Sequence, residues 1–260
     1  GASMALAAQH TMHLYDLSRA GRLAEVEALP AYADFVAREH AHRGSAPYRK
    51  AQAYWKEKLA AKAEPVVFYG CRHRPRTNRV RRVRCPLGAV RSERLRAVAS
   101  QKGFFSRTAD LSLFRLFAAL TAAYLHLAGG SSRLSFGVAF HNRRTAAEKR
   151  TFGLFMEVLP FRLDVSPDDA FPDLLARVST ELFDCLRHRG PAVANPYQER
   201  VYDVIFNYHT RSFTHDHPMH VSSEWIYTDS ASESLSIQVR EDEAGRFVFE
   251  LDIHEVVFDE

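Results

Sequence analysis

Leu134-Ser-Phe-Gly-Val-Ala-Phe140 alternates large apolar side chains with small residues. Such a period of two is typical of a β-strand whose second face packs closely against a neighbour. The preceding residues 108–127 carry apolar side chains along one helical stripe, and Gly129-Gly130 ends that pattern. We therefore predict a core helix that is followed directly by a core strand.

Helical and strand patterns continue on both sides of this pair. Helices are predicted over residues 4–18, from Pro30, from Pro47 and over 171–186. Strands are predicted over 154–165 and 201–208, with a hairpin of 235–239 and 247–253. This mixed order predicts an α/β fold, a sandwich in which a mixed sheet packs on helices.

The composition is that of a folded protein with a nearly balanced surface. Of the 260 residues, 46% are hydrophobic, which is enough for a substantial core and argues against disorder. The 35 Lys and Arg residues against 31 Asp and Glu residues give a net charge of +4, a mild basic bias that suits an acidic partner without requiring one. Neither a bilayer-length apolar run nor a signal-peptide pattern stands out, so we expect a cytoplasmic protein without membrane contact.

The spacing of the cysteines, histidines and acidic residues favours neither a metal site nor a disulfide. Cys71, Cys85 and Cys185 are far apart and form no Cys-x-x-Cys pair, which fits a reducing compartment. His10, His13 and Asp16 share one predicted helical face, and we interpret them as a solvated or interface face. The polar segment 215–220 contains three histidines without a companion Cys or a suitably placed acid, so no metal site is predicted there.

An arginine-rich segment between residues 72 and 84 is the strongest cluster of charge. Its functional interpretations are the docking of an acidic carrier protein, a phosphate or a nucleic acid. The structural alternative is a solvated loop and strand edge, where arginines block pairing with a foreign strand. Stacking aromatics are not interleaved with these arginines, so nucleic acid is the weaker functional choice. The residues are Arg72, Arg74, Arg76, Arg79, Arg81, Arg82 and Arg84.

Four blocks in a fixed order resemble one known family. They are Tyr48-Arg-Lys-Ala-Gln-Ala-Tyr-Trp55-Lys-Glu-Lys-Leu59, Leu134-Ser-Phe-Gly-Val-Ala-Phe-His-Asn-Arg143, Phe152-Gly-Leu-Phe-Met-Glu-Val-Leu-Pro-Phe-Arg162 and Val201-Tyr-Asp-Val-Ile-Phe-Asn-Tyr208. Together they resemble the C-terminal lobe of the condensation domain of nonribosomal peptide synthetases. The third block departs from the family pattern, because Glu157 and Val158 replace an asparagine and a threonine.

The resemblance implies a chloramphenicol-acetyltransferase-like lobe, one of two that form a V around an active-site tunnel. Residues 1–45 would be the end of the N-terminal lobe and a linker, and residues 46–260 would be the C-terminal lobe without its last helix. Such domains join an acyl or peptidyl thioester on one carrier protein to an amine on another. The implied partners are the N-terminal lobe, the carrier proteins and a neighbouring adenylation domain. No cofactor would be bound directly, because phosphopantetheine is attached to the carriers.

The family's signature, His-His-x-x-x-Asp-Gly, is absent from this sequence. A histidine near neutral pKa usually handles the proton in amide formation, so this chain alone is expected to be inactive and to contain no catalytic residue. Its expected contribution is a wall of the tunnel. The wall residues implied by the matched blocks are Asn142, Arg143, Glu157, Pro160, Arg162 and Asn207.

Arg143 is the residue that the family pairs with the aspartate of the signature. Without that partner, the guanidinium must stay hydrated or find another acid, so we expect local disorder or a substitute acid beside it. Two other functions stay open at this point. One is a degenerate lobe that docks carrier proteins or an adjacent domain, and the other is a basic nucleic-acid-binding module.

Overall fold

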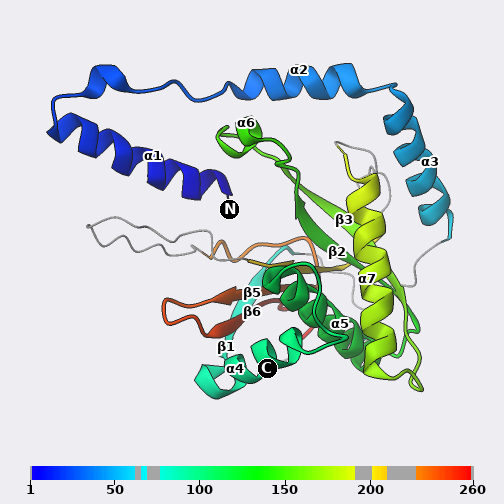
Figure 1. Ribbon diagram of the computed structural model, residues 1–260. Helices are drawn as coiled ribbons and strands as arrows, with labels where there is room; N and C mark the ends of the chain where they lie inside the picture. Colours follow the sequence, from blue (N-terminus) through cyan, green and yellow to red (C-terminus); the bar gives the residue numbers. More distant parts are fainter. Residues whose placement is uncertain (1, 62–65, 69–76, 191–200, 210–226, 259–260) are drawn as a thin grey trace.

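A mixed six-stranded sheet forms the centre of the fold, with the strand order β1-β6-β5-β4-β2-β3 (Figure 1). The computed structural model describes residues 2–61, 66–68, 77–190, 201–209 and 227–258. The strands are β1 (Val80–Pro86), β2 (Arg133–His141), β3 (Met156–Asp164), β4 (Val204–Tyr208), β5 (Leu235–Glu241) and β6 (Phe247–His254). The predicted α/β class is confirmed, and so is the predicted hairpin, which β5 and β6 form.

The sheet combines a central parallel set of three strands with antiparallel strands on both sides. β2 lies parallel to β4, and β4 lies parallel to β5. The pairs β1–β6, β5–β6 and β2–β3 are antiparallel. The carboxyl ends of β2, β4 and β5 therefore meet at one edge of the sheet, which is where open α/β sheets usually place their ligands.

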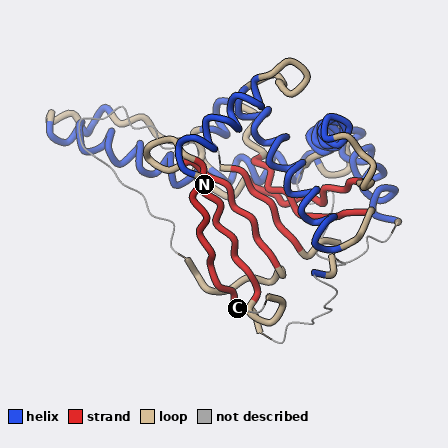
Figure 2. The backbone as a smooth tube through the Cα atoms, turned by 90° about the horizontal axis from the view of Figure 1, so that it is seen from below, coloured by secondary structure: helices blue, strands red, loops and turns tan. Residues whose placement is uncertain are grey.

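Helices cover one face of this sheet. α5 (Ala109–Gly129) packs on β2 and β4, and α7 (Phe171–His188) packs on β3 (Figures 1 and 2). α4 (Gly88–Ser100) lies against α5, and α3 (Ala46–Ala60) lies against α7. α5 is long and apolar enough to cross a bilayer, contrary to the expectation from the sequence. However, 56% of the 18-residue apolar stretch that meets this criterion is buried inside the protein. α5 is accordingly the central helix of the core.

The two faces of the sheet differ in polarity. On β5, Leu235, Ile237 and Val239 belong to the buried core, whereas the alternating Ser236, Gln238 and Arg240 point the other way. The second face is therefore a polar surface on the side away from α5.

An arm at the start of the chain contacts the loop that follows β2. It consists of α1 (Ala2–Arg19), the short 3-10 helix Leu23–Glu25 and α2 (Tyr32–His42), and it extends away from the sheet in Figure 1. Tyr32 donates a hydrogen bond to the Leu154 carbonyl (2.7 Å), and the ring of Phe35 lies 4.2 Å from that of Phe155. This loop, which includes α6 (Ala146–Lys149), connects the arm to the sheet.

Candidate functional site

A cavity of about 490 Å³ lies where the first turn of α1 meets the ends of β2, β3, β4 and β5. Because β2 lies parallel to β4 and β4 lies parallel to β5, His141, Asn207 and Gln238 come together there although they are far apart in the sequence. The described lining residues are Ala2, Ser3, Met4, Ala139, His141, Arg143, Gly153, Leu154, Phe155, Met156, Asn207, Tyr208, His209 and Gln238.

Arg143 joins the arm to the cavity rim. Its Nη1 donates to the carbonyls of Glu148 and Thr151 (2.7 Å to Thr151), and its Nη2 donates to Ser3 Oγ (2.7 Å). Its guanidinium carbon lies 4.1 Å from the centre of the Phe155 ring, a cation–π distance. The fixed fork of donors on arginine is suited to holding several acceptors at once.

An acid does lie near Arg143, which was one of the two outcomes expected, but it forms no direct ion pair with the guanidinium. The acid nearby is Glu148, but its carboxylate accepts from the main-chain nitrogens of Arg144 (2.6 Å) and Thr145 (3.0 Å). In the described part of the chain, neutral carbonyls and one hydroxyl therefore bind the guanidinium directly. Burial lowers the pKa of Arg143, and the charge of Glu148 opposes that shift.

Asn207, His209 and Gln238 form a hydrogen-bonded group on the cavity wall. His209 Nε2 lies 2.8 Å from Gln238 Oε1 and 3.0 Å from Asn207 Nδ2. Gln238 Nε2 donates to Ser236 Oγ (2.8 Å), so with this amide orientation Gln238 Oε1 is an acceptor. His209 Nε2 donates to Gln238 Oε1 in one tautomer and accepts from Asn207 Nδ2 in the other. Burial lowers the pKa of His209, although the hydrogen bond that Gln238 Oε1 accepts from the imidazole works against this shift.

His141 is the second imidazole of the wall, at the end of β2. Burial lowers the pKa of His141, and the charges of Arg143 and Arg189 lower it further. Among the described lining residues there is no Asp or Glu. This wall is therefore neutral to positive, with polar groups that can orient a substrate by hydrogen bonds.

Two of the predicted wall residues, Arg143 and Asn207, line the cavity, and the structure places the other four elsewhere. Asn142 Nδ2 donates to Glu157 Oε2 (3.4 Å) beside the rim. Pro160 is buried on β3 opposite Gly137. Arg162, also on β3, donates from its side chain to the carbonyl of Ala61 (2.7 Å) at the end of α3.

A buried ion pair lies behind Arg162. Lys58 Nζ lies 2.5 Å from Glu181 Oε2, with only 13% and 10% of the two side chains exposed. Glu181 Oε1 also accepts from the main-chain nitrogen of Arg162 (2.8 Å), at the free border of β3. This cluster joins α3, α7 and the sheet, and it lies outside the cavity.

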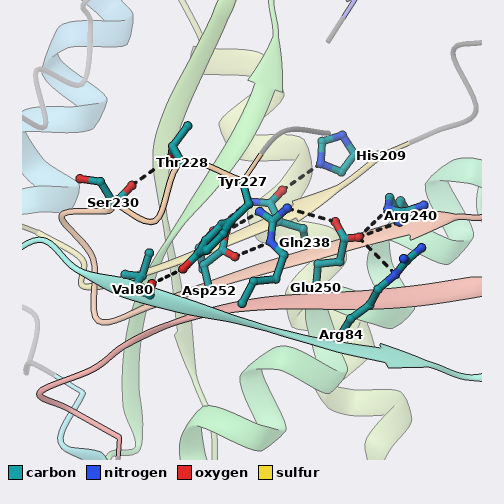
Figure 3. A network of polar contacts seen from close by, with 12 residues as sticks. Val80, Arg84, His209, Tyr227, Thr228, Ser230, Gln238, Arg240, Glu250 and Asp252 are labelled. Atoms are coloured by element: carbon teal, nitrogen blue, oxygen red, sulfur yellow. Dashed lines mark hydrogen bonds and ion pairs between the residues drawn. The ribbon is translucent and has the colours of Figure 1, made fainter. Parts of the chain in front are cut away.

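The arginine-rich segment falls partly on β1. Arg72, Arg74 and Arg76 lie outside the described residues. Arg82 forms a paired contact with Asp252 (2.6 and 2.8 Å), and Arg84 lies 3.6 Å from Glu250 (Figure 3). Arg79 lies 3.6 Å from Glu255, and Arg81 is exposed. The Arg82 side chain is therefore engaged in an ion pair within the protein, whereas the side chains of Arg79, Arg81 and Arg84 are exposed to solvent.

The other candidate groups occupy separate places. His10 contacts Phe152 edge to face, at 6.3 Å between ring centres. In the described ranges there is no group of three metal-ligating side chains, and segment 215–220 falls outside them. Cys85 and Cys185 are free thiols, and burial raises the pKa of Cys185 well above its usual value. Cys71 is not among the described residues.

Sequence reasoning missed His141, His209 and Gln238. His141 and Gln238 lie on the faces of β2 and β5 away from the core, and His209 directly follows β4. For the two histidines a position at a strand end was the available signal, but the parallel order that brings β2, β4 and β5 together cannot be read from one strand.

Known proteins with similar sequences or folds agree on one family. The isonitrile lipopeptide synthase of Streptomyces coeruleorubidus is 29% identical over 189 residues, which are 73% of this chain and 12% of that protein. Surfactin synthase subunit 1 of Bacillus subtilis (strain 168) is 22% identical over 273 residues, 99% of this chain and 7% of that protein. The chain thus spans a small part of these relatives.

Solved structures show the same fold. The first condensation domain of the CDA synthetase matches with a TM-score of 0.79 at 22% identity, over 100% of this chain and 57% of that one. The condensation domain of the monacolin K polyketide synthase MokA matches with a TM-score of 0.77 at 16% identity, over 100% and 62%. The family model of the condensation domain matches residues 1–260. The chain therefore belongs to the condensation-domain family.

Proposed function

We propose that this chain forms one wall of a condensation-domain active site, which makes an amide bond between a carrier-bound acyl or peptidyl thioester and an acceptor amine. The observation that carries this proposal is the cavity at the ends of β2, β4 and β5, where Arg143, Asn207 and His209 converge. In this proposal, residues 1–45 are the end of the N-terminal lobe with a linker, and residues 46–260 are the C-terminal lobe.

The reaction assigns different tasks to the two lobes. The neutral amine attacks the thioester carbonyl, a C–N bond forms, the C–S bond breaks, and the amine proton passes to the departing thiolate. Because this chain lacks His-His-x-x-x-Asp-Gly, the proton-handling histidine is assigned to the N-terminal lobe. The wall described above would hold and align the substrates, which by itself contributes to rate through orientation.

The substrates would be delivered from outside by carrier proteins. Their phosphopantetheine arms bear the thioesters, so this chain would hold no cofactor of its own. Carrier proteins and a neighbouring adenylation domain are the proposed partners, in the cytoplasm.

Reconstitution of the two lobes tests this function. An N-terminal condensation lobe carrying the histidine signature is added in trans to the 260-residue chain with loaded donor and acceptor carriers, and amide product is measured by mass spectrometry. We expect product from the pair and none from either part alone. The control is the same lobe with the second histidine of its signature replaced by alanine. No product from a pair that forms a stable complex would refute the proposal.

A second candidate function is docking of a carrier protein without participation in catalysis. The exposed arginines on and directly before β1 favour it, namely Arg79, Arg81 and Arg84. If the reconstituted lobes bind carrier proteins but form no amide product, this second function is favoured over the first.

A further inference from the structure

The hydroxyl of Ser3, in the first turn of α1, is bonded at two points to the loop that follows β2. Ser3 Oγ donates to the Gly153 carbonyl (2.7 Å) and accepts from the Gly153 main-chain nitrogen (3.2 Å). It also accepts from Arg143 Nη2 (2.7 Å). A serine hydroxyl has one donor and two acceptor sites, so these three bonds use its whole capacity.

These three residues share one edge of the cavity. Ser3, Arg143 and Gly153 all line it, and Ser3 is the residue through which α1 is hydrogen-bonded to the other two. Because its hydroxyl is fully engaged with the protein, Ser3 has no hydrogen-bonding site left for a substrate. Any effect of this hydroxyl on a bound substrate is therefore exerted through the position of its neighbours.

Ser3 holds one end of the Arg143 guanidinium from outside the loop. The loop supplies the carbonyls of Glu148 and Thr151 to Nη1, whereas Nη2 binds Ser3 Oγ and, at 3.3 Å, the Gly153 carbonyl. A long arginine side chain has many rotamers, and acceptors on two separate elements favour one of them. The orientation of Arg143 thus depends on where α1 lies relative to the loop.

Other contacts attach the arm to the same loop without involving Ser3. From α2, Tyr32 donates to the Leu154 carbonyl (2.7 Å), and the rings of Phe35 and Phe155 lie 4.2 Å apart. Removal of the Ser3 hydroxyl would therefore leave the arm attached and loosen mainly the connection between α1 and the cavity edge.

We infer that Ser3 is a positioning residue, whose hydroxyl sets the orientation of Arg143 and of the loop at Gly153 relative to α1 and so aligns the cavity for amide formation. The inference rests on the proposed function and deepens it, because residues 1–45 belong there to the N-terminal lobe and Arg143 belongs to the C-terminal lobe. Ser3 would then form a hydrogen bond between the lobes, to the same arginine that the family pairs with the aspartate of the signature. Alignment matters for this reaction, since a displacement of about 1 Å can lower a rate by about 100-fold.

The first readout is the mobility of the Arg143 side chain in the 260-residue chain, which needs no catalysis. Nitrogen-15 NMR of the arginine side chains measures the rotation about the Cζ–Nε bond, and Arg143→Lys assigns the signal. We expect slow rotation in the parent, because both terminal nitrogens are held by acceptors. Ser3→Ala should speed the rotation by at least about tenfold, because Nη2 loses the nearer of its two acceptors.

The second readout separates alignment from binding. In the reconstituted lobes, Ser3→Ala should lower kcat for amide formation by about tenfold or more, whereas KM for the acceptor carrier should change by less than about twofold. Ser3→Thr retains the hydroxyl and should restore both the slow rotation and most of kcat. The matched control is Ser18→Ala, which removes an exposed hydroxyl near the other end of α1 and should leave both readouts unchanged.

Unchanged rotation of Arg143 in a Ser3→Ala variant that is folded by circular dichroism would overturn the inference. Equal losses in folded Ser3→Ala and Ser3→Thr variants would do the same, and so would a raised KM with kcat retained, because the hydroxyl would then act in binding and not in alignment. Absence of product from the parent lobes would instead refute the proposed function. The rotation is measured on the chain alone, so the two failures are distinguishable.

Discussion

Gly153 shows how a single residue fixes the arm next to the cavity. A Cβ added there would overlap the ring of Tyr32, which is already held by its hydrogen bond to Leu154 and by contacts with Phe35 and Phe155. The ring must then move away from the loop. The absence of a side chain at Gly153 is therefore a condition for the contact between α2 and the loop after β2.

We expect Gly153→Ala to lower the free energy of unfolding by about 1–3 kcal/mol, because the added methyl group overpacks this contact. Urea denaturation measures the change, and hydrogen exchange over Tyr32–His42 locates it. In a Tyr32→Ala background the same replacement should cost almost nothing. Equal costs in the two backgrounds would contradict the steric explanation.

At this scale the sequence predicted part of the cavity. Arg143 and Asn207 were identified because they lie in blocks that resemble the family, and both line the cavity. The neutral ligands of Arg143 were not predicted, because carbonyls of residues 148–153 are provided by the path of the main chain and not by any side-chain type. The sequence reports which charges exist but not which atoms the fold places beside them.

Among the elements, α3 is attached to α7 through one buried charge pair. Burial alone would lower the pKa of Lys58, but the neighbouring Cys185 and Glu181 raise it above its usual value, so the Lys58 ammonium stays charged. Lys58 Nζ also contacts Tyr54 Oη (2.8 Å), and Tyr54 stacks on His188 at 3.9 Å.

We expect Lys58→Met to destabilise the fold by about 3–5 kcal/mol, because it removes the ion-pair partner of the buried Glu181 carboxylate. Denaturant unfolding followed by circular dichroism measures this. The double variant Lys58→Met with Glu181→Gln removes the orphaned charge while retaining an acceptor for the Arg162 N–H, so it should recover part of the loss. If the double variant is no more stable than the single one, charge burial is not the cause.

The polar face of β1, β5 and β6 gives a prediction about pH. Burial alone would raise the pKa of Glu250, but Arg240, Arg82 and Arg84 together lower it below its usual value of 4.5. A carboxyl group with a lowered pKa in the folded state stabilises the fold above pH 4.5, and this contribution is lost as the pH falls through the lowered pKa.

We expect Glu250→Gln to cost about 2–3 kcal/mol at pH 7, because it leaves Arg82 and Arg240 without their shared acid. The difference from the parent should shrink steadily once the pH falls below about 4.5. Urea unfolding curves between pH 3 and pH 7 measure it. A difference that stays constant over this range would show that the ionised carboxylate is not what stabilises these strands.

Element prediction succeeded where a stripe of apolar residues existed. α5 and α7 were predicted within a few residues, because their apolar positions recur at helical spacing. α4 was missed, since Gly88–Ser100 is polar around most of its surface and only Ser92 and Ala99 are buried. Its place against α5 is decided by packing in three dimensions, which no local pattern in that segment records.

For the whole molecule, the exposed arginines of β1 give a test of carrier binding. Arg81→Glu should weaken association with an acidic carrier protein by about threefold to tenfold at low salt, and the effect should fade as salt screens the charges. Arg91→Glu, which changes an exposed arginine of α4, is the matched control and should have little effect. Surface plasmon resonance at several salt concentrations measures both. Equal losses in the two variants would indicate a response to net charge and not a docking surface on β1.

The free border of β3 has a consequence for the molecule in concentrated solution. The main-chain nitrogen of Arg162 points outward and donates to Glu181, and two residues earlier on the same side stands Pro160, which has no N–H to offer. An incoming extended peptide would therefore find two successive donors missing in the middle of this strand. Lateral growth of the sheet from one copy to the next is blocked at β3 by the backbone itself, without any need for repulsion between like charges.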